Sequence, residues 1–212
     1  MTRAVLARGD ILYLVTDRAL CGAAHLTERV EAALRGGVSA VQLREKDLDG
    51  GPLRDLAARL LPLCRAFGVP LLINDRADVA LAVGADGVHL PASSFRVAEA
   101  RHLLGDDKLV GVSTHKVDEV AAAAKEGADF AVFGPVFATA SKAGFGSPRG
   151  LQELRRAVAA STMPVIAIGG VTHEHVGAIR ETGAAGVAVI GAILGAIDSA
   201  DAARTLRAAF AS

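Results

Sequence analysis

The sequence predicts a single α/β domain, a (β/α)8 TIM barrel spanning residues 1–212. Two observations predict this fold: a small-residue phrase recurs before apolar runs, and helix-patterned stretches alternate with those runs. The chain of 212 residues is long enough for one sizeable core and shorter than most two-domain proteins. About eight strand–helix units of ordinary size fill a chain of this length.

The recurring phrase is rich in glycine and alanine. Its glycine suits the end of a helix, and the apolar run that follows suits a strand buried on both faces. The phrase occurs four times, at residues 36–41, 84–88, 127–132 and 183–188.

The apolar runs predict the strands, and the stretches between them predict the helices. Helical stretches such as 53–67 and 117–125 have apolar residues at three- and four-residue steps. Strands separated by helices imply right-handed crossovers and a parallel sheet. An open doubly wound sheet is the alternative, but no Gly-x-Gly-x-x-Gly follows the first strand. The strands are expected at about 11–16, 38–43, 69–73, 86–90, 109–112, 129–133, 164–168 and 186–190.

Two connections differ from the rest in length. The link between the third and fourth strands is short, so its helix must be small. The glycine- and proline-bearing stretch 143–150 is the one long loop, and we expect it to act as a lid.

Composition excludes several function classes. Lys and Arg number 23, as do Asp and Glu, so no basic excess favours nucleic acid or a membrane surface as partner. Residues 1–10 contain no long apolar run, so a secretory signal is not expected, and no apolar run reaches the roughly 18 residues of a membrane span. Cys21 and Cys64 lack metal-site spacing and are expected to remain thiols in the cytoplasm. The oligomeric state stays open, a homo-oligomer included.

Polar residues follow the predicted strands at the end where TIM barrels place their reactive groups. Gly169, Gly170 and Gly191 follow the last two strands, where backbone N–H groups commonly bind phosphate. The alternative is that they are ordinary turn glycines.

Cations and a carboxylate follow earlier strands. Arg44, Lys46 and Lys142 suit a larger anion, the alternative being surface residues or partners of Glu45. Asp75 suits Mg2+, which prefers oxygen ligands and bridges to phosphates, or it caps the next helix.

The histidines differ in their sequence surroundings and so in their expected roles. His115 follows a predicted strand and suits a general acid or base, or a bond at a helix N-terminus. His89 is expected to be packed and structural, whereas His102, His173 and His175 are expected to face solvent.

The strand ends, in their order, resemble the thiamine-phosphate synthase and thiazole tautomerase (TenI) family over nearly the full chain. The resemblance depends on seven phrases in sequence: Tyr-Leu-Val-Thr-Asp at 13–17, Val-Gln-Leu-Arg-Glu-Lys at 41–46, Ile-Asn-Asp at 73–75, Gly-Val-His-Leu at 87–90, Gly-Val-Ser-Thr-His at 111–115, Phe-Gly-Pro-Val-Phe at 133–137 and Ala-Ile-Gly-Gly at 167–170.

The resemblance implies a thiamine-phosphate synthase, a transferase that joins a hydroxymethylpyrimidine diphosphate to a thiazole phosphate and releases pyrophosphate. It implies Mg2+ bound by Asp75 and Ser94, with His115, Ser113 and Lys142 as catalytic residues. The residues implied to bind substrate are Gln42, Arg44, Lys46, Asn74, Ser113, Thr139, Ser141, Lys142, Gly170, Ile190 and Gly191.

Two departures from the synthase pattern keep an alternative open. Ser94 stands where synthases carry a second Mg2+-binding Asp, and the Leu-Pro-x-x-Ser-Phe at 90–95 resembles the tautomerase branch. Gly191 stands where synthases often carry Ser. A metal-free tautomerase acting on a thiazole carboxylate phosphate, with His115 as base, is therefore the alternative activity. A non-catalytic regulatory barrel that binds a phosphate ligand is a second alternative.

Overall fold

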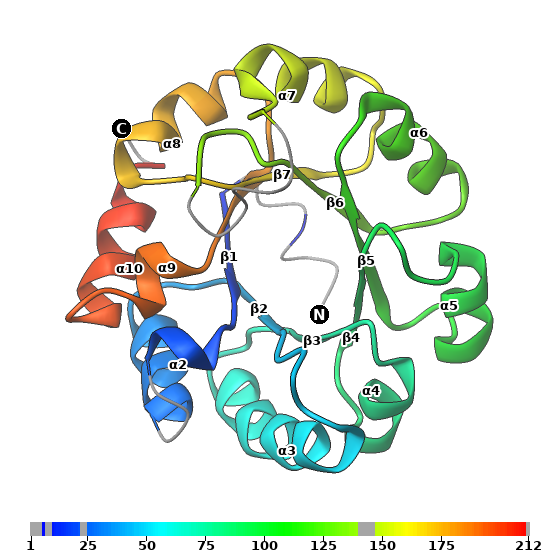
Figure 1. Cartoon of the computed structure of the whole chain (residues 1–212), viewed down its shortest axis with the longest axis vertical. Helices are drawn as coiled ribbons and strands as arrows, with labels where there is room; N and C mark the ends of the chain where they lie inside the picture. Colours follow the sequence, from blue (N-terminus) through cyan, green and yellow to red (C-terminus); the bar gives the residue numbers. More distant parts are fainter. Residues whose placement is uncertain (1–5, 7–9, 22–24, 140–146, 211–212) are drawn as a thin grey trace.

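The computed structural model describes residues 6, 10–21, 25–139 and 147–210, and over these residues the predicted TIM barrel is confirmed. All strands run in parallel and form one closed sheet in chain order, with β8 pairing back onto β1 (Figure 1). The strands are β1 (Ile11–Val15), β2 (Ala40–Leu43), β3 (Leu71–Asn74), β4 (Gly87–Leu90), β5 (Leu109–Thr114), β6 (Phe130–Phe133), β7 (Val165–Ile168) and β8 (Gly186–Val189).

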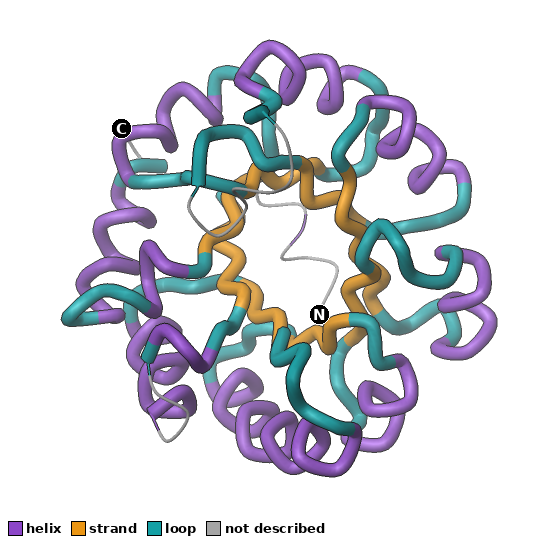
Figure 2. Tube along the Cα trace, viewed as in Figure 1, coloured by secondary structure: helices purple, strands orange, loops and turns teal. Residues whose placement is uncertain are grey.

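Helices surround the strands as an outer ring (Figure 2). The helix between β3 and β4 is short, as its link length predicts. A 3-10 turn, η1 (Arg18–Leu20), follows β1. The α-helices are α2 (Leu26–Arg35), α3 (Gly50–Ala66), α4 (Ala77–Val83), α5 (Val97–Leu104), α6 (Val117–Lys125), α7 (Gly150–Ala159), α8 (His173–Arg180), α9 (Gly191–Leu194) and α10 (Ser199–Ala208).

Three strand boundaries differ by two residues from those the apolar runs predict, and the others by at most one. β2 and β3 begin later, because the N–H groups of Val38 and Val69 bond to carbonyls in the last turns of α2 and α3. β5 is longer and includes Ser113 and Thr114, which pair with β6. This extension places Ser113 in the barrel wall instead of in a loop.

Side chains alternate between two cores along each strand. On β1, Leu12 and Leu14 pack outward against the helices, whereas Ile11 and Tyr13 point into the barrel. Gly111 on β5 leaves room for the ring of Phe130, since a Cβ there would lie 2.2 Å from Phe130 Cζ. The inner core is apolar and consists of Leu6, Ile11, Tyr13, Ala40, Leu72, Leu109, Phe130, Val132, Ile166 and Ala188.

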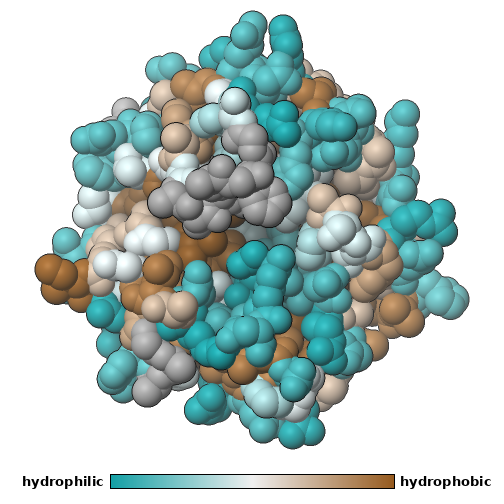
Figure 3. Space-filling model, in the orientation of Figure 1, coloured by the Kyte–Doolittle hydropathy of each residue, from teal (hydrophilic) through white to brown (hydrophobic). Residues whose placement is uncertain are grey.

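The mouth of the barrel lies at the carboxyl ends of the strands. In Figure 3, which looks onto this end, hydrophilic side chains gather over the ends of β2, β3 and β4. Of the predicted lid loop, residues 143–146 lie outside the described residues, while Ser147, Pro148 and Arg149 are exposed before α7 begins. Within the described part of the chain, no helix is long and apolar enough to cross a membrane.

Candidate active site

The predicted site residues within the described chain all lie at the mouth, in or just after strands. Ser141 and Lys142 lie outside the described residues, so their predicted roles stay predictions. The others are Gln42, Arg44 and Lys46 at β2, Asn74 and Asp75 at β3, Ser94 after β4, Ser113 and His115 at β5, Thr139 after β6, Gly170 after β7, and Ile190 and Gly191 after β8.

A chain of hydrogen bonds crosses the barrel interior below the mouth. Gln42 Nε2 donates to the Tyr13 hydroxyl over 3.1 Å, and that hydroxyl lies 3.4 Å from His89 Nδ1. On the other side of the same imidazole, Nε2 lies 2.9 Å from Ser113 Oγ. His89 is packed, as expected from the sequence, yet it also contacts a predicted catalytic hydroxyl.

Burial keeps the His89 and Tyr13 side chains of this hydrogen-bond network uncharged. It lowers the pKa of His89 from 6.5 to about 3, and the positive charge of Arg44 lowers it further in the same direction. Burial likewise raises the pKa of the Tyr13 phenol well above its ordinary value.

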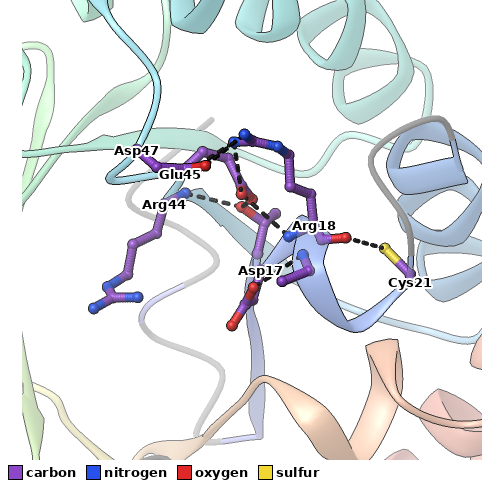
Figure 4. A network of polar contacts seen from close by, with 8 residues as sticks. Asp17, Arg18, Cys21, Arg44, Glu45 and Asp47 are labelled. Atoms are coloured by element: carbon purple, nitrogen blue, oxygen red, sulfur yellow. Dashed lines mark hydrogen bonds and ion pairs between the residues drawn. The ribbon is translucent and has the colours of Figure 1, made fainter.

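A second network holds the backbone that carries the cations. The buried Glu45 carboxylate accepts hydrogen bonds from the Thr16 hydroxyl (2.6 Å) and the Arg18 N–H (3.1 Å). The Thr16 hydroxyl in turn accepts from the Arg44 N–H over 2.9 Å. Arg18 completes the network with an ion pair to Asp47 (Figure 4). Burial raises the pKa of Glu45, and the bonds from Thr16 and Arg18 oppose that shift.

This network pairs Glu45 with Arg18 and not with its neighbours in sequence, Arg44 and Lys46. The sequence left open a pairing of Glu45 with Arg44 or Lys46, but its ion-pair partner is Arg18, at 3.7 Å. In Figure 4 the Arg44 side chain points away from the Glu45 carboxylate. Its guanidinium is therefore available to an anion at the mouth.

A pocket of about 250 Å³ opens beside these residues. Lys46, Asn74 and Asp75 line it together, so residues from two strand ends meet in one space. The remaining lining residues are Leu43, Glu45, Leu48, Leu53 and Arg76.

The predicted metal-binding pair is brought together. The Ser94 hydroxyl donates a hydrogen bond to Asp75 Oδ1. Asp75 has a backbone φ of 64°, a left-handed conformation that costs energy for most residues, and its N–H bonds to the His89 carbonyl over 2.9 Å. The alternative that Asp75 caps α4 is wrong, because Arg76 occupies the cap position and pairs with Asp78.

The donor set at this place suits a metal that arrives with substrate. Across the part of the chain that the structure describes, no three His, Cys, Asp or Glu side chains form a metal cluster. One carboxylate and one hydroxyl match Mg2+, which commonly takes one or two carboxylates, several waters and substrate phosphates.

The loops after β6 and β7 pack closely on one another. Phe137 N–H donates to the Gly169 carbonyl over 3.0 Å. Gly170 has a φ of 64°, and a Cβ there would lie 2.3 Å from the Ala138 carbonyl oxygen. Only glycine fits this position. By contrast, among the described residues a Cβ on Gly191 would meet only Leu20 Cδ1, at 3.8 Å, so on their side that position is open.

Two histidines flank these loops. His115 is half-buried, and its Nδ1 lies 2.5 Å from the Gly134 carbonyl. Because a carbonyl only accepts, Nδ1 holds the proton of the neutral ring and Nε2 retains the lone pair of a base. His175 was expected to face solvent, but it is half-buried and stacks on Phe137 with ring centroids 3.9 Å apart.

Sequence reasoning did not assign site roles to Tyr13, Thr16 or Glu45. Each belongs to a phrase that the resemblance used, yet the residue types alone do not single them out. Their roles depend on partners 27 to 76 residues away in the chain.

Comparisons with known proteins agree with the resemblance. A sequence model of the thiamine monophosphate synthase family matches residues 12–193. The chain is 48% identical over 181 residues to a thiamine-phosphate synthase of Chlorobium luteolum, covering 85% of both chains. It is 46% identical over 196 residues to one of Syntrophomonas wolfei, covering 92% of this chain and 94% of the relative. A solved thiamine phosphate pyrophosphorylase from Pyrococcus furiosus superposes with a TM-score of 0.88 at 34% identity, covering 97% and 98% of the two chains.

Proposed function

This chain belongs to the thiamine monophosphate synthase family, and on that premise we propose how its mouth performs the transferase reaction. A hydroxymethylpyrimidine diphosphate loses pyrophosphate when its C–O bond breaks, and both bonding electrons leave with the pyrophosphate. The nitrogen of a thiazole phosphate then uses its lone pair to form the new C–N bond. The products are thiamine phosphate and pyrophosphate. The supporting observation is the convergence of Lys46, Asn74 and Asp75 on one pocket.

Charge develops on the departing pyrophosphate, and the mouth meets it with cations. Arg44 and Lys46 come from one short loop whose backbone Thr16 and Glu45 hold in place. Preorganised charges of this kind stabilise a transition state without having to reorient. Lys142 is proposed to add a further cation.

Mg2+ is proposed to bind at Asp75 and Ser94, where it would neutralise charge on the diphosphate. A hydroxyl is a weaker ligand than the second carboxylate of other synthases, so this chain is expected to need more Mg2+ than they do.

The two organic groups are assigned to the remaining mouth residues. Gln42 and Ser113, on the floor of the mouth, are proposed to contact the pyrimidine. Backbone and hydroxyl groups at the other strand ends are proposed to bind the thiazole phosphate: Thr139, Ser141, Gly170, Ile190 and Gly191.

The tautomerase remains a second candidate because of one observation. His115 Nε2 is left as a base by the bond from Nδ1 to the Gly134 carbonyl. That geometry suits proton transfer on a thiazole carboxylate phosphate without a metal. A non-catalytic phosphate-binding barrel is the third reading, and turnover by pure protein would exclude it.

The cytoplasm is the proposed compartment of this protein. The free thiols of Cys21 and Cys64 support this proposal, because a reducing compartment keeps cysteines as thiols.

A product assay tests the proposal. Purified protein receives the pyrimidine diphosphate, the thiazole phosphate and Mg2+, and thiamine phosphate is sought by chromatography. Product that disappears with a chelator supports the synthase. Absence of product from folded protein, with turnover of the thiazole carboxylate phosphate, would transfer the assignment to the tautomerase.

Variants of the cations test the site within the synthase. Lys142→Ala and Arg44→Ala are expected to reduce kcat/KM for the diphosphate substrate about 10- to 100-fold, as loss of a charged hydrogen bond predicts. Arg54→Ala is the control: this side chain is exposed on the outer face of α3, so the variant should retain wild-type kinetics. Unchanged kinetics in both site variants would contradict the assignment of these cations.

A further inference from the structure

The hydrogen-bond chain inside the barrel has a direction. The Tyr13 hydroxyl accepts a hydrogen bond from Gln42 Nε2, so its own O–H must donate to another group. The remaining hydrogen-bonding neighbour of this buried hydroxyl, among the described residues, is His89 Nδ1. Tyr13 therefore donates to Nδ1, and that nitrogen is the acceptor of the imidazole.

This direction passes through the imidazole to Ser113. A neutral imidazole with its lone pair at Nδ1 carries its proton at Nε2. Nε2 therefore donates to Ser113 Oγ over 2.9 Å. The Ser113 oxygen is then an acceptor toward the interior, and its own proton is left for a partner at the mouth.

Gln42, at the other end of this series of hydrogen bonds, is oriented in the same way. The side chain of Gln42 donates to Tyr13 through Nε2, and exchanging the amide nitrogen and oxygen would reverse the direction of this bond and of the bonds that follow it. Within the described chain, every fully buried side-chain nitrogen or oxygen has a partner. The Gln42 carbonyl oxygen takes no part in this bond, so it is not fully buried and can accept a hydrogen bond from a ligand at the mouth.

We infer that Tyr13 and His89 are positioning residues that fix the hydrogen-bond polarity of the mouth floor, with Gln42 as the acceptor and Ser113 as the donor. An aminopyrimidine matches this polarity, because its exocyclic N–H donor stands beside a ring nitrogen that accepts. A pyrimidinone has the reverse order, a carbonyl beside a ring N–H. The two buried residues thus select the amino form of the ring, an inference that rests on the pyrimidine substrate proposed above.

The selection is expected to be large, because a site built for one pattern of donors and acceptors leaves buried groups unpaired with the wrong one. Wild-type protein should bind the aminopyrimidine diphosphate about 100-fold more tightly than its 4-oxo counterpart. Isothermal calorimetry with each diphosphate alone, in the absence of thiazole phosphate, measures this ratio.

Tyr13→Phe removes only the hydroxyl that joins Gln42 to His89 in the hydrogen-bond network. The ring can keep its edge-on packing against Phe130, at 5.6 Å between centroids. The Gln42 amide is then free to rotate and His89 to change tautomer, so the affinity ratio should fall at least tenfold. His89→Leu should lower the ratio in the same way. His89→Gln, whose amide N–H can still donate to Ser113, should retain part of it.

Phe130→Leu is the matched control. It perturbs the same inner core but removes no hydrogen bond, so it should lower stability while the affinity ratio stays at the wild-type value. A ratio unchanged in Tyr13→Phe, or lowered equally in Phe130→Leu, would overturn the inference.

The turnover assay keeps the two proposals separate. Thiamine phosphate formation without an amino preference would leave the synthase in place and refute the polarity inference. An amino preference lost in Tyr13→Phe, in protein that makes no thiamine phosphate, would support the inference and refute the synthase.

Discussion

Acidification should destabilise this protein through one buried histidine. His89 is 2% exposed and lies among Tyr13, Phe130 and Ser113, so its imidazole cannot be hydrated when it takes up a proton. The unfolded chain has no such restriction. The perturbation is therefore a change from about pH 7.5 to about pH 5, with His89→Gln as the comparison variant.

The magnitude follows from the pKa of His89, which burial lowers from 6.5 to about 3. Above the ordinary value neither state binds the proton, and the stability linked to neutral His89 is fully present. As the pH falls from 6.5 toward 3, the unfolded state alone becomes protonated, and that stability is progressively lost. At about pH 5 the loss is about 2 kcal/mol, and for a chain of this size Tm should fall by about 4–8 °C.

Urea unfolding at a series of pH values measures this difference. The free energy of unfolding of wild-type protein should decline more steeply below about pH 6.5 than that of His89→Gln, because the variant lacks the titrating group. His102→Gln, an exposed histidine on α5, is the control and should follow the wild-type curve. Parallel curves for wild type and His89→Gln would refute the reasoning.

Three further substitutions at the mouth have expected outcomes. Ser94→Asp should lower the Mg2+ concentration for half-maximal synthase activity by roughly tenfold, because a carboxylate replaces a neutral ligand beside Asp75; a Mg2+ titration that matches wild type would contradict this. Gly191→Ser should change the free energy of unfolding by less than about 0.5 kcal/mol, since among the described residues its Cβ meets only Leu20 at 3.8 Å, and should lower KM for the thiazole phosphate severalfold; a raised KM would argue against a phosphate there. His115→Ala should abolish a tautomerase but only slow a synthase, which steady-state assays with each substrate distinguish.

The fold class, and the end of the barrel at which polar residues gather, follow from local sequence patterns alone. Repeated Gly-Ala phrases mark where helices end and strands begin, and uniformly apolar runs require strands covered on both faces. In a closed parallel sheet the carboxyl ends of all strands meet at one rim. Polar residues such as Arg44, Asp75 and His115 were therefore predicted to gather there before any contact was known.

The same local patterns misplace some boundaries and one surface residue. Val38 and Val69 are apolar and look like strand residues, but their N–H groups close the preceding helices. His175 has polar neighbours in sequence and looks exposed, yet the loop after β6 places Phe137 against its ring. A local pattern does not contain the position of a distant loop.

The pairing of polar groups depends on how distant strands pack together, and local sequence patterns do not contain it. Tyr13 and His89 are 76 residues apart, and they meet because the alternation of β1 and β4 turns both side chains into the same closed interior. Glu45 pairs with Arg18 because β1 and β2 are adjacent parallel strands, so the residues that follow them lie close together, although Arg44 and Lys46 are its neighbours in sequence. Periodicity specifies the face on which a side chain lies, whereas the identity of its partner depends on strand register and barrel closure.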